Sequence, residues 1–278
     1  MTKKKIPLCI WSGLAFVLML ALFLLMLLSP GMGRQGLRET AGKETEGTTL
    51  PPPPENVFTP MDFAYEGDYL TCLTDESHLG IDVSRYQGEI DWEQVKSAGI
   101  QFVMIRLGYR GYGGGQLKED PFAQANYQGA KAAGLKVGAY FFSQAITREE
   151  AVEEAEFAME IAKGWELDMP MVYDWECLAD DYRTVGVDAR RLTDYTKAFC
   201  DTVEAAGYDA MIYFNSNQSR KEMHLEELTG YDFWLAWYSD RMEYPYKVDM
   251  WQYTNEGTVP GISGNVDINL YFPYSEDP

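Results

Sequence analysis

The chain has 278 residues, of which 46% are hydrophobic and 14% aromatic, so it can build a sizeable core and is not a disordered protein. Its formal net charge of −20 argues against nucleic acid or an anionic lipid surface as a partner, because phosphate binding needs clustered Lys and Arg. The negative charge does not exclude neutral substrates or sugars.

The N-terminus carries a membrane-targeting pattern. Lys3, Lys4 and Lys5 precede an almost unbroken apolar stretch over residues 8–28, close to the ~20 residues that a helix needs to cross a bilayer. No clear small-residue cleavage pattern follows it. We expect residues 1–29 to form an uncleaved transmembrane signal-anchor, with a cleaved signal peptide as the alternative. In either case the positive-inside rule places the rest of the chain outside the cytoplasm, at the cell membrane or secreted.

The composition then predicts a spacer, an extension and one domain. Residues 30–57 are rich in Gly, Thr, Glu and Pro, and this composition predicts a disordered or extended linker. Residues 58–78 are more apolar, and we expect them to pack on the domain as an N-terminal extension. Residues 79–278 have a suitable length for one folded domain, which we expect to be monomeric.

Strand and helix patterns alternate through this domain. Helices are expected near residues 91–99, 120–134, 147–163 and 188–207. Short apolar runs predict strands near 80–84, 102–105, 137–142, 169–176, 211–214, 233–238, 248–253 and 266–269. The alternation predicts a parallel α/β barrel. The last strands lie too close together for helices between them, so we expect an irregular (β/α) barrel with fewer helices than strands in its second half.

The cysteines give no metal site. Cys9 lies in the apolar N-terminal stretch, and the other three, Cys72, Cys177 and Cys200, have no zinc-ligand spacing. A Cys177–Cys200 or a Cys72–Cys200 disulfide is possible, as are three free thiols, and the sequence does not choose between them.

The most informative motif is Asp174-Trp175-Glu176, at the end of the apolar run over residues 169–173. Side chains alternate along a strand, so Asp174 and Glu176 share a face while Trp175 points away. Two adjacent carboxylates cannot both ionise cheaply, and one of them therefore acquires a raised pKa. A general acid that works near neutral pH needs such a raised pKa.

Other polar and aromatic residues stand at the ends of the remaining strands. In a β/α barrel these ends face the active site, which groups Asp82, Tyr140, Asp174, Glu176, Tyr213, Trp237, Gln252 and Asp267. Carboxylates among Tyr and Trp suit sugar stacking and glycosidic cleavage. Each residue also has a structural interpretation: the acids as turn or cap residues, the aromatics as core. Arg106 is most simply a structural partner of one of these carboxylates.

Several ordered motifs resemble the glycoside hydrolase family 25 lysozymes, and together they cover residues 79–273. They are Gly80-Ile81-Asp82-Val83-Ser84, Gly88-Glu89-Ile90-Asp91-Trp92, Gly134-Leu135-Lys136-Val137-Gly138-Ala139-Tyr140, Asp174-Trp175-Glu176, Trp251-Gln252-Tyr253 and Val266-Asp267-Ile268-Asn269. The resemblance implies an irregular β/α barrel without metal or organic cofactor. It implies cleavage of the β-1,4 bond between N-acetylmuramic acid and N-acetylglucosamine in peptidoglycan glycan strands.

The resemblance also implies a role for each site residue. Glu176 is the expected general acid, and Asp174 is expected to orient or stabilise the 2-acetamido group or the oxocarbenium ion. Asp82 and Asp267 are the expected flanking carboxylates. The expected sugar-binding wall consists of Tyr140, Tyr213, Trp237 and Gln252.

Three questions stay open at this stage. Retaining, inverting and substrate-assisted routes all fit carboxylates two residues apart on a strand. A chitinase-like or glucosaminidase activity is a second option, although Met169 and Val172 stand where chitinases place further aspartates. The alternative outside enzymes is a silent wall-binding module.

Overall fold

The computed structural model describes residues 50–177 and 183–273. The expected membrane segment, with Cys9, and the expected linker as far as residue 49 lie outside the described residues. Within the two described ranges, every helix is too short or too polar to cross a membrane.

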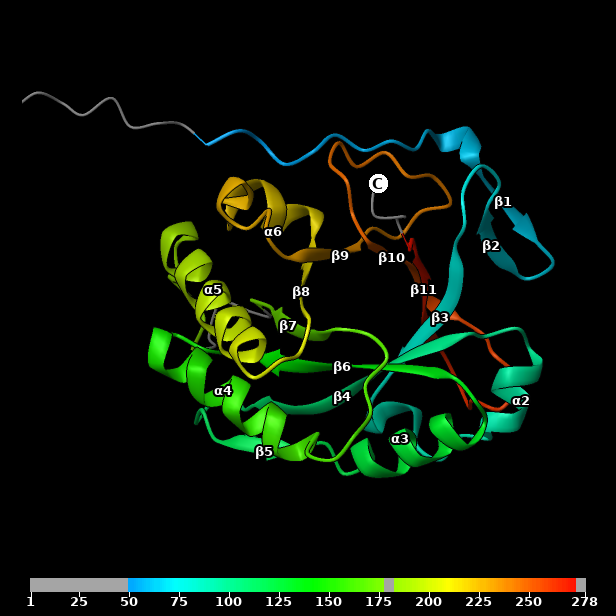
Figure 1. The fold of residues 1–278 in the computed structure, drawn as a ribbon, viewed down its shortest axis with the longest axis horizontal. Coiled ribbons are helices and arrows are strands. Elements are labelled where there is room, and N and C mark those ends of the chain that lie inside the picture. The colour runs from blue at the N-terminus through cyan, green and yellow to red at the C-terminus, as the bar shows by residue number, and fades with distance from the viewer. Residues whose placement is uncertain (1–49, 178–182, 274–278) are drawn as a thin grey trace, which may run out of the picture. The chain divides into compact units, whose positions relative to one another are not determined.

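Eight strands form a closed barrel (Figure 1). Each strand pairs with the next in this order, and the last pairs with the first: β3 (His78–Val83), β4 (Phe102–Arg110), β6 (Lys136–Ser143), β7 (Met171–Trp175), β8 (Ala210–Asn215), β9 (Asp232–Ala236), β10 (Met250–Gly257) and β11 (Val266–Tyr271). The pairs from β3 to β10 are parallel. The described residues contain five α-helices: α2 (Trp92–Ser97), α3 (Ala123–Ala132), α4 (Arg148–Ile161), α5 (Ala189–Ala205) and α6 (Ser216–Lys221). The predicted irregular barrel is confirmed.

The expectation of a parallel barrel is wrong for its closing strand. β11 runs antiparallel to both β10 and β3. Only residues 258–265 connect β10 to β11, which is too short for the helical crossover that a parallel pair requires. The chain therefore turns back in a hairpin, and Asp267 comes to lie opposite Asp82 in the register.

Side-chain caps explain where α2, α4 and α5 start. The side chains of Asp91, Thr147 and Asp188 each accept a hydrogen bond from the backbone N–H three residues later, at 3.1, 3.2 and 2.9 Å. Each cap satisfies one N–H group that has no partner within the helix. α3, α4 and α5 lie outside the strands (Figure 1).

The strands bury both faces. Apolar side chains that point outward pack against the helices, whereas those that point inward form a second core within the barrel, which includes Met104, Val172, Met211, Trp234 and Met250. This inner core closes the barrel below its polar end, so the interior is a packed floor and not a pore.

The N-terminal segment lies along the domain. Residues Pro60–Asp62 form a 3₁₀ turn (η1), followed by the hairpin of β1 (Phe63–Glu66) and β2 (Tyr69–Cys72). The Phe63 ring lies 5.0 Å from that of Trp251. Residues 50–57, from the expected linker, also contact the domain: the N–H of Lys247 donates to the carbonyl of Pro54 at 2.8 Å, and that of Asn56 to Pro245 at 2.9 Å.

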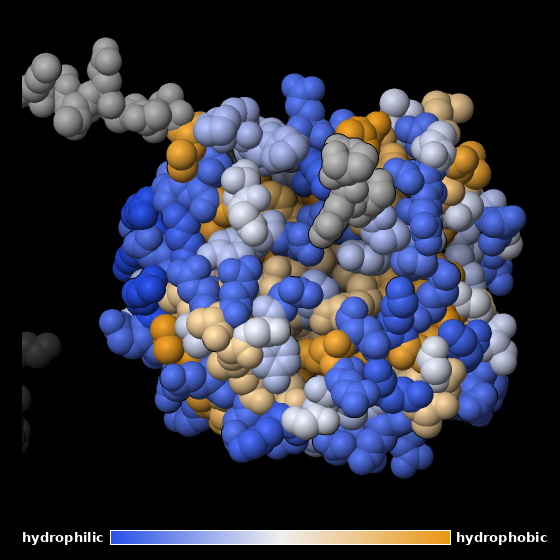
Figure 2. All heavy atoms as spheres, viewed as in Figure 1, coloured by the Kyte–Doolittle hydropathy of each residue, from blue (hydrophilic) through white to orange (hydrophobic). Residues whose placement is uncertain are grey.

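The remaining elements are short. β5 (Leu117–Glu119) pairs antiparallel with β4, and 3₁₀ turns cover Arg85–Gln87 (η2) and Leu225–Glu227 (η3). The three cysteines of the described residues, Cys72, Cys177 and Cys200, are free thiols. The face shown in Figure 2 is mainly hydrophilic, with apolar residues in small separate patches, as the high charge of the chain leads one to expect.

Candidate active site

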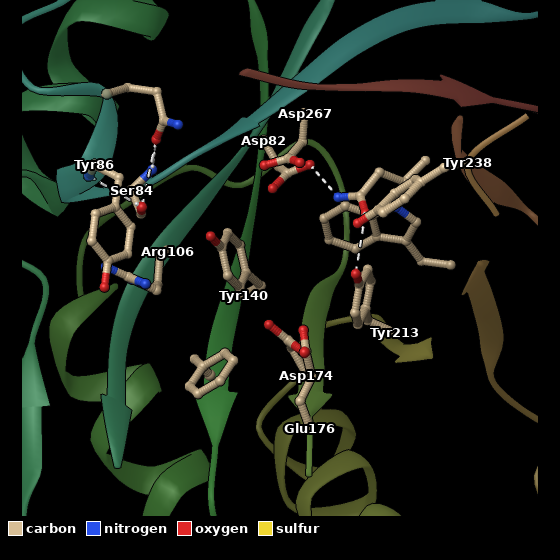
Figure 3. A pocket seen from close by; sticks show the side chains of 14 residues that line it. Asp82, Ser84, Tyr86, Arg106, Tyr140, Asp174, Glu176, Tyr213, Tyr238 and Asp267 are labelled. Carbon is tan, nitrogen blue, oxygen red and sulfur yellow. Dashed lines mark hydrogen bonds between the residues drawn. The ribbon is translucent and has the colours of Figure 1, made fainter. Parts of the chain in front are cut away.

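A cleft of about 210 Å³ opens at the carboxyl ends of the parallel strands (Figure 3). Seven of the eight predicted site residues line it: Asp82, Tyr140, Asp174, Glu176, Tyr213, Gln252 and Asp267. Residues that the sequence analysis did not name also line it, among them Tyr86, Phe142, Trp234 and Tyr238. The prediction that the strand ends converge on one site therefore agrees with the geometry.

Asp174 and Glu176 point together into this cleft (Figure 3). Trp175 between them points outward, and its indole N–H donates to the carbonyl of Ala145 at 2.9 Å. Asp174 is only 6% exposed, and its Oδ1 has no hydrogen-bond partner among the described residues. Burial, followed by the charge of Glu176, raises the pKa of Asp174 well above its ordinary value. Burial, followed by the charge of Asp82, also raises the pKa of Glu176.

Asp82 and Asp267 form the other side of the acidic site, on neighbouring strands. Asp82 Oδ2 accepts hydrogen bonds from Gln252 Nε2 at 2.8 Å and from Asn269 Nδ2 at 3.0 Å. Burial raises the pKa of Asp82 to about 6, although these two donors favour its ionised form. Burial, and next the charge of Asp82, raises the pKa of Asp267 to about 8.

Four carboxyl groups thus share one poorly solvated cleft. Like charges in a medium of low dielectric repel each other strongly. The four carboxyls together therefore hold protons at pH values at which isolated carboxyls are ionised. Because the four carboxyls interact, their protons are lost in steps that belong to the coupled set and not to single residues. Because Asp82 receives two amide N–H groups, it is the acid best prepared to carry a negative charge. The site can therefore offer a proton donor and a carboxylate at the same pH.

Tyr213 and Tyr238 form one wall of the cleft. Both hydroxyls donate to Gln252 Oε1, each at 3.1 Å. Gln252 therefore connects the tyrosines to Asp82 through a continuous set of hydrogen bonds, and the tyrosine rings leave an apolar surface beside the acids. Below them, Trp234 Nε1 donates to Asn269 Oδ1 at 2.9 Å and fixes the amide that contacts Asp82.

Trp237, the eighth predicted residue, does not line this cleft. The inward positions of β9 and its continuation are Trp234, Ala236 and Tyr238, so residue 237 falls on the other face. Trp237 instead borders an adjoining cavity of about 410 Å³, which shares Glu176, Tyr213 and Tyr238 with the cleft. The period-2 rule, if continued past the strand, would have selected Tyr238.

Arg106 differs from its predicted role. It lines the cleft, but its Nε donates to Oδ2 of the buried Asp120 at 2.8 Å, and this ion pair does not involve any of the four site acids. Its charge still lowers the pKa of Asp174 and of Asp82, against the larger effect of burial. Within the described ranges, no three His, Cys, Asp or Glu side chains are arranged to hold a metal ion.

Comparison with known proteins agrees with this architecture. The family model for glycosyl hydrolases family 25 matches residues 81–262. Lysozyme M1 of Streptomyces globisporus is 30% identical over 206 residues, which cover 69% of this chain and 67% of that protein. The autolytic lysozyme of Clostridium acetobutylicum is 27% identical over 193 residues, and the match spans only 55% of its length.

Solved structures give the same result. The bacterial lysozyme from Streptomyces coelicolor superposes with a TM-score of 0.58 at 28% identity, over 72% of this chain and 94% of that one. The modular autolysin LytC from Streptococcus pneumoniae gives a TM-score of 0.62 at 26% identity, over 71% of this chain and 47% of that one. The family model matches more than half of the length of this chain, and the chain therefore belongs to glycosyl hydrolases family 25.

Proposed function

We propose that this protein is an N-acetylmuramidase that hydrolyses the β-1,4 bond between N-acetylmuramic acid and N-acetylglucosamine in peptidoglycan. The observation that carries the proposal is the four-carboxyl cleft, in which burial holds Asp174, Glu176 and Asp267 at raised pKa values. Glycosidic cleavage needs a protonated carboxyl for the leaving oxygen and a carboxylate on the other side of the ring. Family membership and relatives named as lysozymes support the same chemistry.

In this proposal Glu176 is the general acid. It borders both the cleft and the adjoining cavity, so a sugar ring in each would place their bridging oxygen beside its carboxyl. Asp174 would orient the 2-acetamido group or stabilise the positive charge that develops on the ring. Asp82 and Asp267 would hold the substrate or the attacking water and keep the proton on Glu176.

The aromatic and amide residues would bind the sugars. Tyr140, Tyr213 and Gln252 line the cleft, and Tyr238 joins them. Trp237 would contact the sugar in the adjoining cavity. Stacking of apolar sugar faces on tyrosine and tryptophan rings provides affinity that does not depend on charge.

We also propose that residues 1–29 anchor the protein in the cell membrane, with the domain outside. The three lysines before the apolar stretch support this orientation. If the segment is retained, alkaline carbonate leaves the protein in the membrane fraction. Release of the protein into the supernatant would favour the cleaved, secreted form.

Glu176→Gln tests the catalytic proposal. Glutamine keeps the size of the side chain but cannot donate the proton, so we expect the release of reducing ends from peptidoglycan to fall about 10²–10⁴-fold. Glu156→Gln, an exposed position on α4, is the matched control and should retain full activity. If both variants equal the wild type, Glu176 is not the acid.

The products identify the bond. Borohydride converts the new reducing end of each fragment to an alditol, and a muramidase yields muramitol. Glucosaminitol would replace the proposal with a glucosaminidase. A wild-type protein that releases no reducing ends, yet sediments with peptidoglycan, would be a wall-binding module.

A further inference from the structure

Next to one end of the cleft lies a cluster of cations and tyrosines, which we call the Arg85 cluster. It is made of Arg85, Tyr86, Tyr109 and Lys118, and Tyr86 is its member that lines the cleft. The guanidinium carbon of Arg85 lies 5.1 Å from the centre of the Tyr86 ring and 5.3 Å from that of Tyr109. Its Nη1 donates to the Tyr109 hydroxyl at 3.2 Å, and its Nη2 to the Tyr86 hydroxyl at 3.3 Å. Lys118 Nζ lies 6.0 Å from the centre of the Tyr109 ring.

Within residues 50–177 and 183–273, no carboxylate forms an ion pair with the cations of this cluster. Among the described residues, neither Arg85 nor Lys118 has a carboxylate within ion-pair distance. The neighbouring acid, Asp120, is already paired with Arg106 and accepts only the backbone N–H of Arg85, at 3.0 Å. In a chain with 43 acidic and 23 basic residues, most cations near the surface have an acidic partner available. Arg85 therefore offers a free positive charge.

The position of the cluster connects it to the catalytic cleft. Tyr86 is 68% exposed and lines the same cleft as Asp174 and Glu176. In Figure 3, Tyr86 and Arg106 lie at the end opposite Tyr213 and Tyr238, with the acids between. A glycan strand that runs through the cleft would pass Tyr86 at one end, and a substituent that extends beyond this ring would reach Arg85, which contacts the Tyr86 hydroxyl.

The geometry suits a carboxylate. Contacts with two tyrosine rings restrict the rotation of the Arg85 side chain, and a guanidinium held in place presents a planar fork that matches a carboxylate. Hydrogen bonds between ionised groups are about twice as strong as neutral ones. Asp82, the acid best prepared to carry a negative charge, repels an anion within the cleft, so a carboxylate on the substrate needs a cation that lies apart from it.

We propose that the Arg85 cluster binds a carboxylate substituent of the glycan strand and selects strands built on muramic acid. This inference rests on the proposed function, because the muramic ring carries a lactyl ether. That ether ends either in its own carboxylate or in a peptide stem, which bears further carboxylates. A plain N-acetylglucosamine polymer lacks both groups.

Binding to soluble glycan fragments tests this without relying on turnover. The background is Glu176→Gln, which holds substrate without cleaving it, and calorimetry at low salt compares it with Glu176→Gln combined with Arg85→Gln. Three ligands are used: strands with intact stems, strands freed of stems by an amidase, and strands whose carboxylates have been converted to methylamides. Lys136→Gln, an exposed cation at the opposite end of β6, is the control for net charge.

We expect Arg85→Gln to raise Kd about tenfold for strands that carry carboxylates and less than twofold for methylamide strands. Arg85→Lys should retain part of the affinity that Arg85→Gln loses. Lys136→Gln should leave Kd unchanged. A loss on stem-free strands identifies the lactyl carboxylate, and a loss confined to strands with stems identifies the stem. An equal loss on methylamide strands, or no loss on any strand, overturns the proposal. An inactive wild type would instead contradict the muramidase function and leave this binding result standing.

Discussion

Asp82 and Glu176 act on each other through the cleft, because the negative charge of Asp82 raises the pKa of Glu176, second only to burial. Removing that charge by Asp82→Asn lowers the pKa of Glu176, so the acid loses its proton at a lower pH. We therefore expect the alkaline limb of kcat/KM against pH to move to lower pH. The amide oxygen of asparagine can still accept from Gln252 and Asn269.

The position of the limb, and not the height of the profile, is the measurement, since Asp82→Asn also lowers the rate. Tyr238→Phe is the control: it removes one hydrogen bond to Gln252 without changing a charge, so it should lower the profile and leave the limb in place. If the alkaline limb of the Asp82→Asn profile does not move, or moves to higher pH, then Asp82 does not keep the proton on Glu176.

Single residues of this site were predictable where a simple rule applied. Alternation along the strand placed Asp174 and Glu176 together, and the strand-end rule brought in Asp82. Asp267 lies at the amino end of β11 and reaches the cleft only because that strand is antiparallel, which the rule did not foresee. The partner of Arg106 was not predictable, because Asp120 reaches it from another loop and no spacing in the sequence reports that contact.

The end of β7 is held by its neighbouring elements. Gln144, just after β6, donates from Nε2 to the carbonyl of Glu176 at 2.6 Å, and Gln218 in α6 donates in the same way to the carbonyl of Trp175. Both glutamines are buried. Each is also anchored, since the N–H of Gln144 donates to Glu154 and the Oε1 of Gln218 accepts from the N–H of Asn215. The two amides therefore fix the backbone that presents Glu176.

We expect Gln218→Met, which keeps the approximate shape but removes both the amide donor and the amide acceptor, to lower kcat about tenfold with KM little changed. The reason is that a displaced acid weakens the transition state more than the bound substrate. The carbonyl of Trp175 and the N–H of Asn215 both lose their partner, and each should cost about 1–3 kcal/mol of stability. Gln128→Met, exposed on α3, is the control. A lowered melting temperature with an unchanged kcat would assign Gln218 a purely structural role.

Elements with an apolar pattern, with or without a side-chain cap before it, were predictable from the sequence. Three of the four predicted helices begin directly after a capping side chain, which is Asp91 for α2, Thr147 for α4 and Asp188 for α5. By contrast, α6 was not predicted: although Asn215 caps it, its six residues are all polar and give no apolar pattern. The direction of β11 depends on the length of the connection before it and on pairing with β3, a strand far away in the sequence.

For the whole domain, the buried acids make stability depend on pH. Burial raises the pKa of Asp82 to about 6, of Glu154 to about 7 and of Asp267 to about 8, and it raises the pKa of Asp174 well above its ordinary value. A carboxyl whose pKa is raised by folding binds more protons in the folded state. Its contribution is therefore complete below about pH 4 and is lost as the pH rises through the folded value.

We accordingly expect the free energy of unfolding to decrease between about pH 5 and pH 9, and Asp174→Asn to remove part of that decrease. Asparagine carries no charge to desolvate, so the variant should exceed the wild type by about 1–3 kcal/mol at pH 8 and match it near pH 4. Denaturant unfolding at both pH values measures the difference. Asp240→Asn, an exposed aspartate outside the cleft, makes the same change in net charge and should alter stability little. If it stabilises the protein at pH 8 as much as Asp174→Asn does, then the overall charge of −20, and not burial in the active site, sets the alkaline instability.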